Sequence, residues 1–99
     1  YLHLIEGQTR GDRGYGGFDY AALRALFSRP WMVNNGYDRA LALQVVAEGG
    51  ADLVAFGRPF IGNPDLGRRM REGLPWAESD RSLYYASGAR GYTDYPAAA

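Results

Sequence analysis

The sequence predicts an α/β fold with a parallel sheet, and two observations support this. Three short apolar segments are each followed by a loop and then by a helical pattern of roughly ten residues, which is typical of βαβ units. These segments are rich in Val, Leu, Ile and Phe without clean polar alternation, which predicts strands buried on both faces. The pattern alone leaves open whether the sheet is doubly wound or part of a (β/α)8 barrel.

The first predicted strand covers residues 1–5 and is followed by a glycine-rich stretch at 7–17. Asp19 can cap the next helix, because its carboxylate accepts a hydrogen bond from a free N–H group of the first turn. Pro30 is expected to end this segment. One face of the helix would carry the apolar side chains Leu23, Leu26 and Phe27.

The second predicted strand covers residues 31–33. Asp38 can cap the following helix, expected over 39–48, and Gly49 and Gly50 would stop it, because glycine adopts the left-handed backbone that ends many helices. The apolar side of this helix would carry Leu41, Val45 and Val46.

The third predicted strand covers residues 52–56 and leads through a brief loop to a third helix. Asn63 would cap that helix and Pro64 would take its first position, where a missing N–H costs nothing. The helix would run to about Arg71. Residues 75–99 lack a strong period and are expected to form an ordered extension across the sheet, with a frayed end at 97–99.

Composition restricts the function classes. Eleven basic residues balance eleven acidic ones, so the chain lacks the electrostatic footprint of nucleic-acid or membrane binding. The chain has no cysteine, which excludes disulfides and cysteine-based metal or redox chemistry. No secretory signal opens the sequence, and a cytoplasmic location is expected. The first residues, from Tyr1, already resemble the middle of a strand, which predicts that the chain is a fragment.

Two loops suggest a phosphate site. Gly57 and Arg58 follow the third strand, where glycine permits close approach to the backbone and arginine offers a planar set of donors. Asn35 and Gly36 follow the second strand. The loops after successive parallel strands lie at the same edge of a sheet, and in barrels such loops often hold phosphate. The competing interpretations are a strand-ending turn with a surface arginine, and a hairpin at Asn35–Gly36.

The remaining motifs give weaker evidence of a functional site. The glycines at 11–17 match neither the dinucleotide fingerprint nor the P-loop, so a flexible loop at a site rim is expected. His3 is predicted to be a buried, hydrogen-bonded core histidine. Glu6 ends the first strand on the expected ligand side and could touch a site there, but a loop-capping role or an indirect role behind the site is favoured. No residue pattern forms a catalytic triad or a metal site.

The chain resembles the C-terminal part of the Old Yellow Enzyme family of FMN-dependent ene reductases, on its bacterial branch with N-ethylmaleimide reductase and pentaerythritol tetranitrate reductase. The motifs span almost the whole chain in the family's order: Tyr1-Leu-His3, Asn35-Gly-Tyr37, Val54-Ala-Phe-Gly-Arg58, Asn63-Pro-Asp-Leu66 and Gly88-Ala-Arg-Gly-Tyr-Thr-Asp-Tyr-Pro96.

The resemblance implies a single partial domain over 1–99, in which 1–74 supply strands six to eight of a (β/α)8 TIM barrel and 75–99 form a C-terminal extension. It implies that the FMN phosphate binds the backbone of Asn35, Gly36 and Gly57 and the side chain of Arg58. Phe56 would flank the flavin. Tyr85 would contact the substrate, and Thr9 occupies a rim position.

The resemblance also implies the activity of the complete enzyme, in which hydride passes from NADH or NADPH through non-covalent FMN to an activated alkene. The substrate-orienting pair and the proton-donating tyrosine of the family lie on earlier strands, so no catalytic residue is expected here and the segment alone should be inactive. The alternatives are another phosphate-binding TIM-barrel enzyme and a non-enzymatic α/β ligand-binding module. The sequence leaves the oligomeric state open.

Overall fold

The structure is a computed structural model that describes residues 1–7, 13 and 16–99. The chain divides into two compact units, Tyr1–Phe56 and Gly57–Ala99, and each is described by itself. The glycine-rich stretch at 11–17 and the rim residue Thr9 fall largely or wholly outside the described residues.

The first unit is built on a parallel sheet of three strands in the order β1-β2-β3. The strands are β1 (Leu2–Ile5), β2 (Trp31–Asn34) and β3 (Leu53–Ala55). Val33 pairs with Leu4 on one side and with Val54 on the other, which fixes the register. The predicted parallel sheet and its strand sequence are therefore confirmed.

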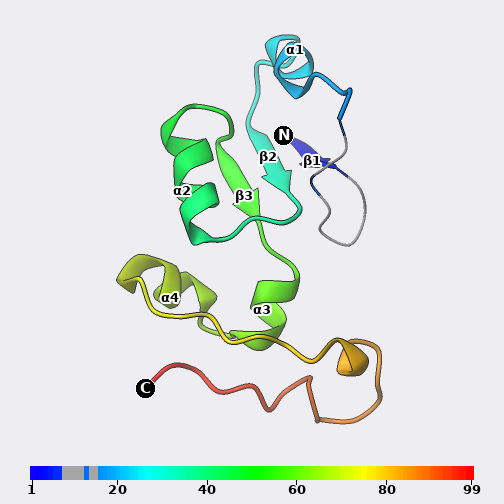
Figure 1. Cartoon of the computed structure of the whole chain (residues 1–99), viewed down its shortest axis with the longest axis vertical. Helices are drawn as coiled ribbons and strands as arrows, with labels where there is room; N and C mark the ends of the chain where they lie inside the picture. Colours follow the sequence, from blue (N-terminus) through cyan, green and yellow to red (C-terminus); the bar gives the residue numbers. More distant parts are fainter. Residues whose placement is uncertain (8–12, 14–15) are drawn as a thin grey trace. The chain divides into compact units, whose positions relative to one another are not determined.

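Two helices complete the first unit. The short helix α1 (Tyr20–Ala25) is capped by Asp19, whose carboxylate accepts a hydrogen bond from the Ala22 N–H. Helix α2 (Arg39–Ala47) is capped in the same way by Asp38 and contacts β3 (Figure 1). Gly49 follows α2 with a left-handed φ of 75°, as its sequence position predicted.

The core of the first unit lies around the middle strand. Trp31 and Val33 of β2 are each 2% exposed, and Ala42 of α2 is the buried residue of its helix. Leu26 is 86% exposed and Val46 45%, so the predicted apolar faces of both helices were partly wrong. Helix α2 contacts β3, and the small side chain of Ala42 is the one that this helix buries.

The prediction that the strands are buried on both faces was also wrong. Exposure alternates along β1, where His3 and Ile5 are exposed, and Leu53 of β3 is 47% exposed. Within the described residues β1 and β3 each pair with one neighbour only, so both edges of the sheet stay open. His3 is therefore not the buried core histidine that the sequence analysis expected.

The second unit begins with a helix that the sequence analysis missed. Residues predicted to form a brief loop form α3 (Arg58–Gly62), which is followed by α4 (Leu66–Glu72) and a 3₁₀ turn at Arg81–Leu83. Asp65, not Asn63, takes the N-cap position of α4. Gly73 ends that helix with a φ of 68°.

Asn63 holds the following segment instead of capping a helix. It is fully buried, its amide donates to the carbonyls of Pro59 and Ala77, and its oxygen accepts from the Ala77 N–H at 2.7 Å. Because every polar atom of the side chain is used, burial carries no cost for an unmet hydrogen bond.

Helix α4 binds the end of the chain. The Asp65 carboxylate accepts from the Ala98 N–H at 2.9 Å, and Arg68 donates to the carbonyls of Ala98 and Ala99. The buried Arg69 bridges Asp65 and the carbonyl of Pro75. The expected fraying at 97–99 was therefore wrong, while the position of the extension across the sheet stays a prediction.

Candidate functional site

The candidate site begins where β2 and β3 end. Asn34 and Ala55 are paired neighbours on these parallel strands, so the residues after them leave the same edge of the sheet. Asn35 and Gly36 follow β2, and the half-buried Phe56 follows β3. Within the first unit, the sheet therefore brings three of the predicted flavin-binding residues to one edge.

The turn after β2 has an uncommon backbone. Asn35 has a φ of 99° and Gly36 a φ of 69°, so two successive residues are left-handed. This conformation suits glycine but is disfavoured for a residue with a Cβ, and asparagine tolerates it better than most. No β-strand pairing follows the turn, because α2 comes next, which excludes the hairpin alternative.

Asn35 is tied to the end of β1 and to Arg13. Its side-chain amide donates a hydrogen bond to the backbone carbonyl of Glu6, and its own carbonyl accepts one from the Arg13 guanidinium at 2.6 Å. The Glu6 N–H in turn donates to the carbonyl of Asn34 at 3.1 Å. The turn is thus fastened to the end of the neighbouring strand at Asn34 and at Asn35, its first left-handed residue.

A cluster of Glu6, Arg13 and Tyr37 adjoins this turn. Tyr37 is 7% exposed and its hydroxyl donates a hydrogen bond to the Glu6 carboxylate. The Arg13 guanidinium lies 3.6 Å from that carboxylate and stacks over the Tyr37 ring, 4.3 Å from its centroid. Burial, followed by the bond to Glu6, raises the pKa of Tyr37 to about 12, so the phenol stays protonated near neutrality.

In the second unit, Gly57 and Arg58 form the start of α3. Gly57 has a negative φ of −96°, and a Cβ added to it would meet no atom within 4 Å. The half-buried Arg58 has no ion-pair partner among the residues that the structure describes. A glycine with open space, followed directly by an arginine without an ion-pair partner in the described part of the chain, offers groups that suit an anion.

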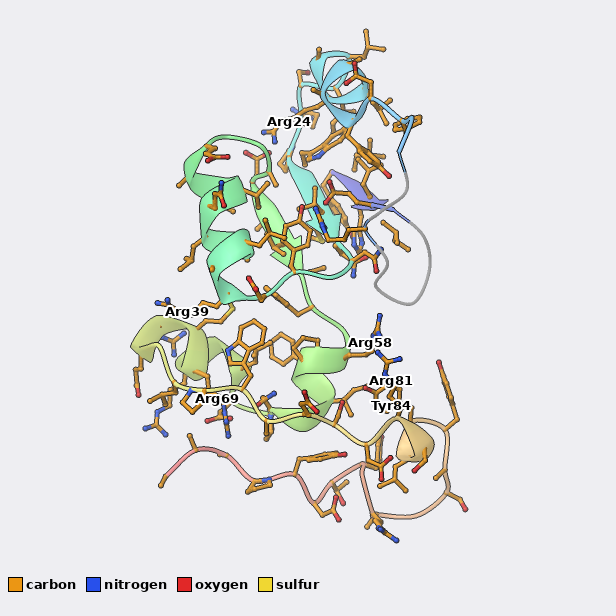
Figure 2. All side chains as sticks on the ribbon, in the orientation of Figure 1. Arg24, Arg39, Arg58, Arg69, Arg81 and Tyr84 are labelled. Carbon is orange, nitrogen blue, oxygen red and sulfur yellow. The ribbon has the colours of Figure 1, made fainter. Side chains whose placement is uncertain are left out.

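A pair of hydroxyl groups, from Ser79 and Tyr84, lies near the backbone of Arg58. The Ser79 hydroxyl lies 3.5 Å from the Arg58 carbonyl and 2.6 Å from the Tyr84 hydroxyl. Figure 2 shows Arg58 projecting from α3 in the same region of the second unit as Tyr84 and Arg81. Ser79 therefore contacts the backbone of Arg58 and does not contact its guanidinium.

Tyr85, the predicted substrate contact, is fully exposed. A nearby hollow of about 440 Å³ in the second unit does not include it. That hollow is aromatic in character and is lined by Phe60, Ile61, Pro64, Tyr84, Gly91, Tyr92, Thr93 and Tyr95.

The described residues contain no cluster of side chains that could bind a metal ion. Over 1–7, 13 and 16–99, no three His, Asp or Glu side chains come together in a way that could hold a metal ion. In the same part of the chain, no helix is long and apolar enough to cross a membrane.

Sequence reasoning missed Tyr37 and Arg13 as partners of Glu6. The bond from Tyr37 to Glu6 spans 31 positions along the chain and that from Arg13 to Tyr37 spans 24, so no local pattern points to the cluster. The only available signal was a tyrosine directly after the Asn35–Gly36 turn, together with the acidic residue at the end of the preceding strand.

The sequence model of the NADH:flavin oxidoreductase / NADH oxidase family matches residues 4–77 of the chain. The chain belongs to this family. A putative 12-oxophytodienoate reductase 12 from Oryza sativa subsp. japonica is 50% identical over 106 aligned residues, which cover 97% of this chain and 26% of that protein. The 12-oxophytodienoate reductase 1 of the same plant is 40% identical, with 97% and 26% covered.

Solved structures of this oxidoreductase family agree. The old yellow enzyme from Trypanosoma cruzi is 38% identical, with a TM-score of 0.88 over 98% of this chain and 25% of that one. Morphinone reductase in complex with tetrahydroNAD is also 38% identical, with a TM-score of 0.85 over 100% of this chain and 26% of that one. The Old Yellow Enzyme resemblance is therefore confirmed, and the fold is a segment of that family's barrel.

The chain spans about a quarter of the length of these relatives. The assignment to strands six to eight, the bacterial branch and the roles of individual site residues stay predictions.

Proposed function

We propose that this chain is the segment of an FMN-dependent, NAD(P)H-using ene reductase that holds the FMN phosphate. The observation that carries the proposal is Arg58, whose guanidinium has no ion-pair partner in the described part of the chain and which directly follows the open Gly57 in sequence. Membership of a flavin oxidoreductase family favours a flavin over a sugar phosphate as the bound group.

Different residues of the chain would contact the phosphate, the flavin and the substrate. Arg58 would donate charge-assisted, bidentate hydrogen bonds to phosphate oxygens, the geometry for which a guanidinium is suited. Asn35, Gly36 and Gly57 would donate backbone N–H groups, which can approach closely because two of the three residues are glycine. Phe56 would pack against the flavin, and Tyr85 would border the substrate.

When bound, the flavin supplies the redox chemistry, taking hydride from NADH or NADPH and passing it to an activated alkene such as an enal, enone or maleimide. The contribution of this segment is to anchor and orient the cofactor. It contains no group that we assign to hydride or proton transfer.

The phosphate role is tested in the apoprotein that carries this chain by titrating FMN and riboflavin, which differ only in the phosphate, and following flavin fluorescence. Arg58→Ala should weaken FMN binding by about 5- to 150-fold, as expected for a lost charge-assisted contact of about 1–3 kcal/mol. Riboflavin binding should not change, because riboflavin has no group for Arg58 to contact.

Arg29→Ala is the matched control. It removes the same charge from an exposed position just before β2. That position is at the N-terminal end of the strand, whereas the Asn35–Gly36 turn follows its C-terminal end. If Arg58→Ala and Arg29→Ala lowered FMN affinity equally, the effect would be one of net charge, and Arg58 would not belong to the site.

A further inference from the structure

The Asn35–Gly36 turn needs to be held in place before it can bind an anion. A φ of 99° at a residue with a Cβ is disfavoured, and a turn with this backbone is expected to relax unless its surroundings fix it. Backbone N–H groups that must first be ordered bind more weakly than preorganised ones, because the ordering free energy is taken from binding.

The cluster of Glu6, Arg13 and Tyr37 provides this fixation from one side. Tyr37 directly follows the turn, and its buried hydroxyl bonds to the Glu6 carboxylate at the end of β1. Glu6 also accepts the Asn35 side-chain amide through its backbone carbonyl. One acidic residue therefore holds both the first residue of the turn and the residue that follows it.

The charges of the cluster compensate one another, so the cluster does not repel an anion nearby. An isolated carboxylate at this edge of the sheet would repel a phosphate. The Glu6 carboxylate instead faces the Arg13 guanidinium at 3.6 Å and accepts the Tyr37 hydroxyl, so its charge is compensated locally. Arg13 donates to the Asn35 carbonyl as well, so the partial negative charge of that carbonyl is also compensated.

We propose that Tyr37 and Glu6 are positioning residues, which hold the Asn35–Gly36 turn so that its backbone N–H groups face the phosphate of FMN. The inference rests on the proposed function, because it assumes that phosphate binds at this turn. Neither side chain touches the ligand, and both act through the backbone of the turn.

The test uses the apoprotein that carries this chain, with FMN and riboflavin as the two probes. Tyr37→Phe removes one oxygen and keeps the ring. It should weaken FMN binding about tenfold, close to the low end of what a hydrogen bond to a charged group contributes. Riboflavin affinity should stay within about twofold of the unmodified protein, since a phosphate-free flavin does not use the turn.

Glu6 variants test the same bond from its other partner. Glu6→Gln keeps an oxygen that can accept the Tyr37 hydroxyl and should restore most of the FMN affinity that Glu6→Ala loses. The double variant Tyr37→Phe/Glu6→Ala should bind FMN about as well as Glu6→Ala alone, because both changes break one shared bond. In the unliganded protein, amide hydrogen exchange at Gly36 should be faster in Tyr37→Phe.

The outcomes separate this inference from the proposed function. If Arg58→Ala lowers FMN affinity while Tyr37→Phe and Glu6→Ala do not, phosphate binds but the positioning role is wrong. If Tyr37→Phe lowers FMN and riboflavin affinity by the same factor, the residue supports the fold in general and the positioning role is again wrong. If Arg58→Ala leaves the ratio of FMN to riboflavin affinity unchanged, the proposed function itself fails.

Discussion

Substituting Gly57 by alanine separates binding from folding. The φ of Gly57 is −96°, outside the left-handed region, and an added Cβ meets no atom within 4 Å. Alanine also restricts the unfolded chain, which offsets small strains in the native state. The free energy of unfolding of Gly57→Ala should therefore stay within about 1 kcal/mol of the unmodified protein.

FMN binding should respond differently. If the phosphate approaches the Gly57 backbone within hydrogen-bonding distance, the new methyl group occupies part of the space that the phosphate needs. Displacing the ligand enough to lose one charge-assisted hydrogen bond corresponds to about 1.5–3 kcal/mol, or roughly a 10- to 150-fold loss of FMN affinity. Fluorescence titration measures this loss, and urea denaturation measures stability on the same preparation.

Gly49→Ala is the control with the opposite pattern. Gly49 has a φ of +75° and open space around it, and it lies outside the proposed site at the end of α2. Alanine there should cost about 1–2 kcal/mol of stability through the left-handed backbone and leave FMN affinity unchanged. The reasoning would be refuted if Gly57→Ala bound FMN normally, or if it lost riboflavin affinity to the same extent.

Two further predictions concern stability. Gly91→Ala should destabilise the protein more than Gly88→Ala by about 1–3 kcal/mol. Both glycines have a positive φ, but only at Gly91 would the added Cβ lie 2.6 Å from the Cβ of Leu83. Equal urea midpoints for the two variants would contradict this prediction and show that Leu83 moves aside freely. Stability should also fall between pH 10 and about pH 12, because the pKa of Tyr37 is raised to about 12 in the folded protein and an unfolded tyrosine titrates near 10. This contribution is fully present below pH 10 and is lost as the pH rises through the folded value. Urea denaturation at pH 9 and pH 11 should show a smaller fall in Tyr37→Phe, and an identical fall in both proteins would contradict the assignment.

The sequence predicted the elements whose signals are local. Asp19, Asp38 and Gly49 each act within one turn of the helix that they begin or end, and the structure confirms all three. The parallel sheet was predictable for a related reason, since strands alternating with helices leave few other arrangements.

Features that depend on distant partners were not predictable. Asn63 has the sequence context of a helix cap before Pro64, yet its side chain binds Ala77, 14 positions away. The helical conformation at Arg58–Gly62 was hidden by a glycine and a proline near its start, which indicate a loop in isolation.

The candidate site shows the same division. Gly57 and Arg58 stand out in sequence because their residue types suit a phosphate. The open space at Gly57, and the lack of an ion-pair partner for Arg58 among the residues that the structure describes, agree with that interpretation. The cluster that supports the Asn35–Gly36 turn could not be found, because Glu6 and Tyr37 meet only once β1 and β2 are paired.

The central claim is tested most directly by a crystal structure of the flavin-loaded protein that carries this chain. The account predicts phosphate oxygens about 2.7–3.2 Å from the Arg58 guanidinium and from the backbone nitrogens of Gly36 and Gly57. A flavin whose phosphate is held by other residues, with Arg58 turned away from it, would contradict the account.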